Sequence, residues 1–74
     1  MNYNYLRYFS VLAQLEHYTL AAARLGISQP SLSSAIHNLE TELGVQLFEK
    51  VGRNIRLTEE GRFYQEKVTT ALNE

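Results

Sequence analysis

The chain has 74 residues, enough for one small domain, and a domain of this size buries only about 60% of the surface that its unfolded form exposes. A hydrophobic content of 45% is typical of globular proteins and argues against wholesale disorder. The absence of cysteine excludes disulfides and thiolate metal sites, and the net charge of −1 argues mildly against a nucleic-acid partner.

The charges are unevenly distributed along the chain. Residues 17–39 contain a single permanently charged side chain, Arg24, and residues 50–58 contain cations but no acid. Local charge therefore matters more than the total when a polyanionic partner is considered. The number of cations is nevertheless low, so we expect modest non-specific affinity for nucleic acid from one copy of the chain.

Targeting and metal-binding signals are missing from the sequence. The N-terminal residues lack the basic segment and apolar run of a signal peptide, and no apolar stretch approaches the roughly 20 residues that cross a bilayer. We therefore expect a cytoplasmic protein without membrane contact. His17 and His37 have no carboxylate or thiolate partner at ligand spacing, so neither a metal site nor a cofactor is expected.

Two helices are expected at the start of the chain. Asn4 can cap the first helix, which runs to about residue 16. Apolar residues at helical spacing mark its buried side: Leu6, Phe9, Leu12 and Ala13. The second helix covers residues 19–25 and would be capped by either His17 or Thr19.

A short turn follows the second helix. Gly26 suits the left-handed backbone at a helix C-terminus. Ser28 is placed to cap a third helix over residues 29–43, and Pro30 falls in its first turn, where a missing N–H costs nothing. This pattern is a helix-turn-helix signature over about residues 18–37.

The third helix has two distinct faces. Its apolar side consists of Leu32, Ala35, Ile36, Leu39 and Leu43. Its other side is small and polar, and consists of Pro30, Ser33, Ser34, His37 and Thr41. Short side chains without acids suit a helix that enters the DNA major groove, although an isolated face of this kind is more often simply solvated. The turn before it favours the DNA interpretation.

After Gly44 apolar residues alternate with polar ones, which is the pattern of β-strands. Alternating apolar residues predict two short strands over residues 45–50 and 55–57, and the turn between them carries Arg53. A hairpin directly after a helix-turn-helix is a wing, here over about residues 46–57, and its tip would lie against the DNA backbone or the minor groove. The alternative is an ordinary surface hairpin with a solvated arginine.

A fourth helix is expected after Thr58, which would cap it, with Glu59 and Glu60 at the positive end of its dipole. Gly61 in the first turn costs roughly 1 kcal/mol relative to alanine, which suggests a close approach to the body of the domain. A stripe then follows at a spacing of four and three: Tyr64, Val68, Ala71 and Leu72. This stripe can pack on the domain or on a second copy of the same helix, and we predict that it mediates dimerisation.

These elements predict a mainly α fold with a small β-hairpin. A winged helix-turn-helix with a three-helix core and a two-stranded wing would occupy residues 1–58. Residues 59–74 would form the start of a linker or dimerisation helix.

Several segments of the chain follow the pattern of one family. They are LRYF (6–9), YTLAA (18–22), LGISQPSLS (25–33), ELGVQLF (42–48) and LTEEG (57–61), together with Ile36, Leu39 and Glu40. They span essentially the whole chain, and their order makes the match specific. On these segments the sequence resembles the N-terminal domain of a LysR-type transcriptional regulator.

The resemblance implies a bacterial protein that reads a pseudo-palindromic double-stranded DNA operator as a homodimer, with a tetramer possible at full length. It also implies that the last helix is a linker that mediates dimerisation. Members of the family carry a larger C-terminal effector domain with a periplasmic-binding-protein-like fold, through which a small-molecule inducer would act. We expect that domain to be absent here, so that the chain is an isolated DNA-binding domain.

The family pattern places Gln29, Pro30 and Ser33 at the DNA. The full set of expected DNA-binding residues is Ser28, Gln29, Pro30, Ser31, Ser33, Ser34, His37, Arg53 and Asn54. The side chain of Gln29 can pair bidentately with adenine, and helix amides near Ser28 can hold a phosphate. Arg53 matches the cation of the wing.

The chain departs from the family pattern at Ser34 and His37, where many relatives carry arginine at one or both positions. Fewer long cations on this face should weaken the attraction to phosphates and alter base preference. Since histidine becomes charged in mild acid, we hypothesise that DNA binding strengthens below about pH 6.5. Equal affinities at pH 8 and pH 6 would contradict this hypothesis.

Two other functions fit parts of the sequence. A winged helix used only for protein contacts gains weight from the net charge, but the acid-free helix face and Arg53 speak against it. A small hydrolase could use Ser33 and His37, one helical turn apart. Because no orienting acid or oxyanion loop is evident and a pocket has little room, we expect no enzymatic activity.

Overall fold

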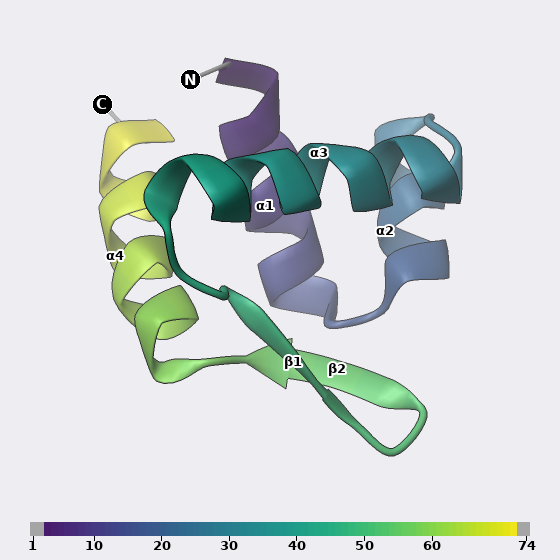
Figure 1. The fold of residues 1–74 in the computed structure, drawn as a ribbon. Helices are drawn as coiled ribbons and strands as arrows, with labels where there is room; N and C mark the ends of the chain where they lie inside the picture. Colours follow the sequence, from purple (N-terminus) through teal and green to yellow (C-terminus); the bar gives the residue numbers. More distant parts are fainter. Residues whose placement is uncertain (1–2, 73–74) are drawn as a thin grey trace.

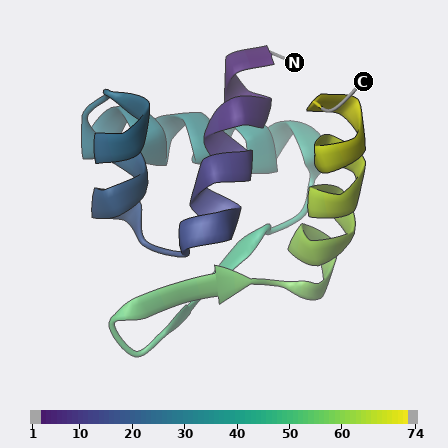
Figure 2. The ribbon, with the colours of Figure 1, turned by 180° about the vertical axis from the view of Figure 1, so that it is seen from behind.

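A computed structural model describes residues 3–72 of the chain and contains four helices and a two-stranded antiparallel sheet. The elements are α1 (Tyr3–Leu15), α2 (Tyr18–Leu25), α3 (Gln29–Leu43), β1 (Phe48–Val51), β2 (Asn54–Leu57) and α4 (Glu59–Leu72). α3 crosses α1, with α2 and the tip of the β1–β2 hairpin at one end of the molecule and α4 at the other (Figure 1, Figure 2). The predicted mainly α, winged helix-turn-helix fold is confirmed. Residues 1–2 and 73–74, at the ends of the predicted segments, lie outside the described residues.

The core lies where α1, α3 and the hairpin meet. The largest fully buried side chains are Phe9, Leu12, Leu32, Ile36, Leu39 and Leu47. The ring of Phe9 is central, because its centroid lies 5.5 Å from that of Phe48 and 5.1 Å from that of Tyr64. The predicted apolar stripes are confirmed for most members, whereas Leu6 and Leu43 are half-buried and pack at the edge of the core.

The first helix begins earlier than expected. α1 already includes Tyr3, so Asn4 lies inside its first turn and the prediction that Asn4 caps the helix is wrong. At the other end, Glu16 adopts a left-handed backbone with φ of 49° and turns the chain. His17 then caps α2, because its Nδ1 accepts a hydrogen bond of 3.2 Å from the backbone N–H of Leu20. Of the two caps predicted for α2, the structure therefore uses the histidine.

The turn between α2 and α3 follows the predicted pattern. Gly26 ends α2 with φ of 71°, a left-handed conformation that favours glycine. The hydroxyl of Ser28 accepts a hydrogen bond of 3.1 Å from the backbone N–H of Ser31 and so caps α3. Pro30 lies in the first turn of α3, where it removes no helical hydrogen bond.

The wing, which we define as β1, β2 and their turn, starts later than predicted. Residues 45–47 form a bend, not the start of a strand, and β1 begins at Phe48. Val45 is exposed and Leu47 is fully buried, so the predicted alternation does not hold there. The reason is that Leu47 is held from two sides: its N–H donates to the carboxylate of Glu40, and its carbonyl accepts from the N–H of Thr58.

The turn at the wing tip is shorter than expected. Val51 pairs with Asn54 in the antiparallel register, so only Gly52 and Arg53 remain between the strands. A two-residue connection matches the twist of the two strands and fixes their register. The wing therefore occupies residues 48–57, with Gly52 and Arg53 in the turn at its tip.

The start of α4 closes the domain. The hydroxyl of Thr58 accepts a hydrogen bond of 2.9 Å from the N–H of Gly61 and donates one of 2.6 Å to the carbonyl of Gln46. A Cβ atom on Gly61 would collide with the carbonyl oxygen of Leu47 and press on the side chain of Leu57. The predicted cap and close approach are confirmed. Within residues 3–72, no helix has both the length and the apolar character needed to cross a bilayer.

Candidate nucleic-acid interface

The outer face of α3 and the wing tip are open to solvent. Every predicted DNA-binding residue is exposed: Ser28, Gln29, Pro30, Ser31, Ser33, Ser34, His37, Arg53 and Asn54. α3 presents those from Gln29 to His37 because its opposite face is buried through Leu32, Ile36 and Leu39, and the wing tip carries Arg53 and Asn54. The face is therefore available to a partner without any rearrangement of the core.

One depression brings the start of α3 together with the wing. Its lining comes from the turn before α2, from α2, from the start of α3 and from the wing, and consists of Glu16, His17, Tyr18, Thr19, Gln29, Lys50, Arg53, Asn54 and Ile55. Gln29 is thus a neighbour of Arg53 and Asn54 in space although they are far apart in sequence. Lys50 was missing from the predicted set, and its signal was the acid-free segment that it begins.

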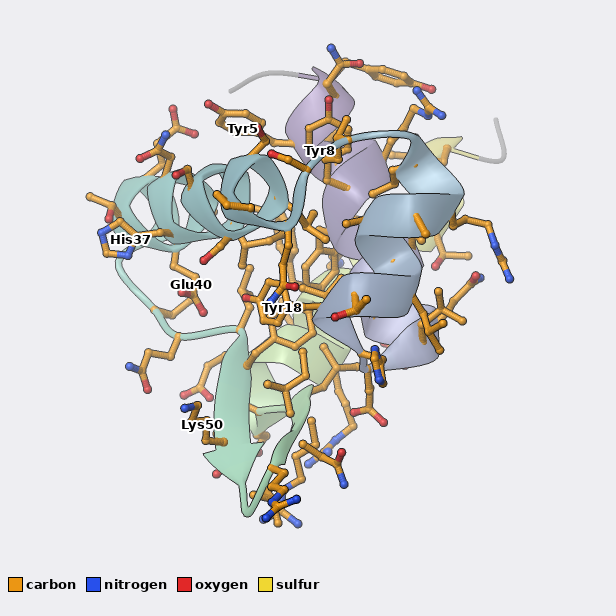
Figure 3. The ribbon with its side chains drawn as sticks, turned by 90° about the vertical axis from the view of Figure 1, so that its right-hand side faces the viewer. Tyr5, Tyr8, Tyr18, His37, Glu40 and Lys50 are labelled. Carbon is orange, nitrogen blue, oxygen red and sulfur yellow. The ribbon has the colours of Figure 1, made fainter. Side chains whose placement is uncertain are left out.

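The other predicted residues lie in different surroundings. Pro30, Ser31 and Ser34 flank a second depression beside Tyr5 and Tyr8 of α1. His37 lies in the second half of α3 and lines another depression, with Glu40 and Thr41 (Figure 3). The structure thus spreads the predicted set along α3 and does not gather it at one point.

Two of the predicted hydroxyls already take part in the start of α3. Ser28 Oγ donates to Ser31 Oγ over 2.8 Å and accepts from the N–H of the same residue. Since a hydroxyl has one donor and two acceptor positions, both can still accept further hydrogen bonds. Their role at DNA stays a prediction.

The side chain of Gln29 is tied to α2. The hydroxyl of Thr19 donates to Gln29 Oε1 over 3.1 Å, across the turn between the two helices. Both residues are exposed, so this hydrogen bond lies on the surface of the molecule. The amide end of Gln29 is therefore oriented before any partner arrives.

Two carboxylates hold the base of the wing. Glu40 Oε2 accepts from the N–H of Leu47 at 2.7 Å and of Phe48 at 3.3 Å. Glu16 Oε2 accepts from the N–H of Leu57 at 2.9 Å. Figure 3 shows Glu40 pointing from α3 towards the wing. Sequence reasoning missed both roles, because the partner amides carry no side-chain signal.

These carboxylates also change the electrostatics of the face. The Glu40 carboxylate points into the joint between α3 and the wing, and it also borders a depression shared with His37 and Thr41. Burial, and then the nearby Glu40 carboxylate, raise the pKa of the Tyr18 phenol above its usual value. The Tyr18 phenol, which lines the depression, therefore holds its proton to a higher pH than a free tyrosine does.

The cations of the wing differ in whether an acid lies close to them. Arg56 Nε lies 3.5 Å from Glu49 Oε2 across the two strands, so an acid offsets its charge. Lys50 and Arg53 line the depression next to Gln29. The local excess of positive charge therefore lies at the wing tip and beside the start of α3.

The predicted dimerisation stripe on α4 packs mainly against the core of its own domain. Val68 is buried, and Tyr64 and Leu72 are half-buried against the core, whereas Ala71 is exposed. On the outer side of α4, Phe63 is 63% exposed. A part in dimerisation stays a prediction for the stripe. Within residues 3–72, no three His, Asp or Glu side chains come together as a metal site requires.

Comparison with known proteins identifies the family. The family model of bacterial regulatory helix-turn-helix proteins of the lysR family matches residues 3–62 of the chain. The chain belongs to this family.

The LysR-family relatives are transcriptional regulators. The HTH-type transcriptional regulator BudR of Klebsiella aerogenes is 48% identical over 72 residues, which cover 97% of this chain and 50% of BudR. The HTH-type transcriptional regulator BenM of Acinetobacter baylyi is 44% identical over 73 residues, which cover 99% of this chain and 24% of BenM. The chain thus spans half the length of BudR and about a quarter of BenM.

Solved LysR-family structures share the fold closely. The BenM DNA-binding domain in complex with benA site 1 DNA matches with a TM-score of 0.94 at 41% identity, over 99% of this chain and 85% of that one. The CbnR DNA-binding domain in complex with DNA matches with a TM-score of 0.93 at 36% identity, over 99% and 84%. The fold of this chain is therefore that of LysR-family domains that have been crystallised on DNA.

Proposed function

We propose that this chain is the sequence-specific DNA-binding domain of a bacterial LysR-type transcriptional regulator that acts in the cytoplasm and is not an enzyme. α3 would enter the major groove, and the wing would lie at the backbone or in the minor groove. The observation that carries this proposal is the close match to the BenM domain in its DNA complex. The exposed, polar face of α3 supports it, and the Glu40 carboxylate is bonded to backbone amides at the base of the wing.

The depression beside Gln29 suggests how the roles are divided. Gln29 at the first position of α3 would read a base, because a glutamine amide can donate to and accept from adenine at once. Lys50 and Arg53 would neutralise phosphates, and Asn54 lies beside them. Ser28, Pro30, Ser31, Ser33, Ser34 and His37 would contact the duplex along α3.

We propose a homodimer on a pseudo-palindromic operator, with a tetramer possible in a full-length regulator. Dimer contacts would come from α4, as the sequence predicts. Because Tyr64, Val68 and Leu72 face their own domain, the side chains that α4 leaves exposed, Phe63 and Ala71 among them, support this role best. A small-molecule inducer would act only through an effector domain outside residues 1–74.

A winged helix used only for protein contacts is the competing proposal, and no relative described above supports it. Substitution of Gln29 and of Arg53 separates the two functions. For a site selected from a random duplex library, Gln29→Ala should cost about 1–3 kcal/mol of binding free energy and relax the preference at one base pair. Arg53→Ala should weaken binding more uniformly across sequences and reduce its salt dependence.

Competitive binding measured by fluorescence anisotropy checks both outcomes. A thermal melt of each variant shows that the fold is intact, and both residues are exposed, so little change is expected. If both variants bound the selected site as the native chain does, the DNA-reading proposal would be wrong.

A further inference from the structure

The hydrogen bond between Thr19 and Gln29 links two helices at the point where a base would be read. Thr19 lies in the first turn of α2 and Gln29 is the first residue of α3, ten positions further on. Both side chains line the depression that also holds Lys50 and Arg53. We propose that Thr19 is a positioning residue for base recognition, which it performs by fixing the side-chain amide of Gln29. This inference rests on the proposed function.

A glutamine needs such a partner because its amide has two unlike ends. Bidentate pairing with adenine requires the amide oxygen at the adenine N6 amino group and the amide NH2 at N7. With the two ends exchanged, the same side chain would place a donor against a donor. An exposed glutamine also rotates about several bonds, and holding it still costs conformational entropy on binding.

In the structure the Thr19 hydroxyl bonds to the oxygen end of the Gln29 amide and leaves the reading edge free. It donates to Gln29 Oε1 over 3.1 Å. A carbonyl oxygen has two acceptor positions, so Oε1 can accept from Thr19 and from adenine at the same time. The NH2 group remains available to donate to N7. The bond therefore orients the amide and leaves the complete adenine pattern intact.

Thr19 belongs to α2, a helix that is capped at both ends and packed in the core. α2 is capped at its start by His17 and at its end by Gly26, and its buried residues Ala21 and Ala22 pack in the core. Threonine branches at Cβ, which restricts rotation about its first side-chain bond. Gln29 is equally fixed at its backbone, because it follows the α3 cap directly. The Thr19 hydroxyl is therefore held in a fixed position next to the backbone that carries the Gln29 amide.

The test substitutes Thr19 in two ways. Thr19→Val keeps the shape of the side chain and removes the hydroxyl, whereas Thr19→Ser keeps the hydroxyl. The base pair read by Gln29 is first located as the position at which Gln29→Ala relaxes the preference of sites selected from a random duplex library. Affinities for the selected site and for the site altered at that pair are then measured by fluorescence anisotropy. Thermal melts of the variants check folding.

The expected result is a loss of discrimination confined to one base pair. A hydrogen bond of ordinary strength changes a binding ratio by about threefold to tenfold, so Thr19→Val should lower discrimination by about that factor. Thr19→Ser should keep most of it. The salt dependence of binding should not change, since no phosphate contact is removed. In the Gln29→Ala background, Thr19→Val should have no further effect.

Other outcomes overturn the inference. Equal losses from Thr19→Val in the native and Gln29→Ala backgrounds would mean that Thr19 acts on the DNA itself or on the fold. Unchanged discrimination in Thr19→Val would mean that the hydrogen bond does not position the amide. If the native chain selected no site at all, the proposed function would fail, and the positioning role would fail with it.

Discussion

The helix-turn-helix and the wing are held in place by different kinds of contact. In the helix-turn-helix, His17 and Ser28 cap their helices through residues only three positions away. In the wing, Glu40 binds amides seven and eight positions away, and Glu16 binds one that is 41 positions away. The helix-turn-helix, which is proposed to read DNA, is therefore capped by hydrogen bonds between residues that are close in sequence. The wing depends on two carboxylates that belong to other elements.

Because their contacts differ, the helix-turn-helix and the wing should respond differently when the wing joint is disturbed. Gln29 and the α3 face should keep their orientation when the wing is disturbed, because their bonds lie within residues 17–31. Arg53, in contrast, would keep its proposed contact with DNA only while the wing joint is intact. Disturbing the joint should therefore act first on the contribution of Arg53 to binding.

The largest effect is expected at the junction of the wing and α4. Gly61→Ala would push a methyl group into the backbone carbonyl of Leu47, which cannot move aside without breaking the joint. We expect a loss of about 2–4 kcal/mol in the free energy of unfolding, measured with urea. Gly26→Ala is the matched control in the helix-turn-helix: it has open space around it, and only its left-handed backbone costs about 1–2 kcal/mol. Equal losses at the two positions would mean that the contact with Leu47 does not set the cost at Gly61.

The next effect is expected at Glu40. Glu40→Ala removes the acceptor of two backbone amides that are partly buried, and a hydrogen bond to a charged group contributes about 1.5–3 kcal/mol. Stability should fall by about that amount, and Arg53→Ala should cost less DNA affinity in this background than in the native chain. Glu40→Gln keeps an oxygen acceptor and should lose less. An undiminished effect of Arg53→Ala would show that Glu40 does not position the wing.

A smaller effect is expected from the local cap of α3. Ser28→Ala removes the hydroxyl that accepts from Ser31, and loss of such a cap costs about 1 kcal/mol. Ser33→Ala, on the exposed face of the same helix, should change stability by no more than about 0.5 kcal/mol. Thermal or urea unfolding checks both variants. If the two substitutions cost the same, the cap would not be what fixes the start of α3.

The smallest effect concerns alkaline pH. Burial and the Glu40 charge raise the pKa of Tyr18, and burial and the Glu42 charge raise that of Tyr64. The folded state therefore holds these protons more tightly than the unfolded state, in which tyrosine ionises near pH 10. The contribution of these two tyrosines to stability should be constant below about pH 10 and fall as the pH rises above it. Tyr18→Phe should make this fall shallower in urea melts from pH 9 to pH 11, and an unchanged slope would contradict the assignment.

The helix-turn-helix could be predicted from sequence because its signals are local. Gly26 acts through its left-handed backbone, Ser28 through its hydroxyl and Pro30 through its missing N–H, so their spacing predicts the start of α3 correctly. Gly44 predicts its end. The close approach at Gly61 could be inferred as well, because a glycine in the first turn of a helix lowers stability and is expected where a side chain would not fit.

The wing joint could not be predicted in the same way. The start of β1 was placed three residues too early, since nothing in residues 45–47 shows that Leu47 turns inward to meet Glu40 and Thr58. Similarly, the spacing of the stripe on α4 does not show whether the stripe packs on its own domain or on a second copy of the helix. Only the fold shows that Tyr64 and Val68 meet Phe9 and its neighbours.

Fluorescence anisotropy of the chain with duplex DNA tests the central proposal most directly. A palindromic site selected from a random library and a random duplex are compared at several salt concentrations, for the chain alone and for the chain fused to a dimerising helix. We predict binding whose affinity falls steeply with salt and a persistent preference for the palindrome, with half-sites about one helical turn apart. Equal affinity for both duplexes, or no binding at low salt even in the fused form, would contradict the proposed function.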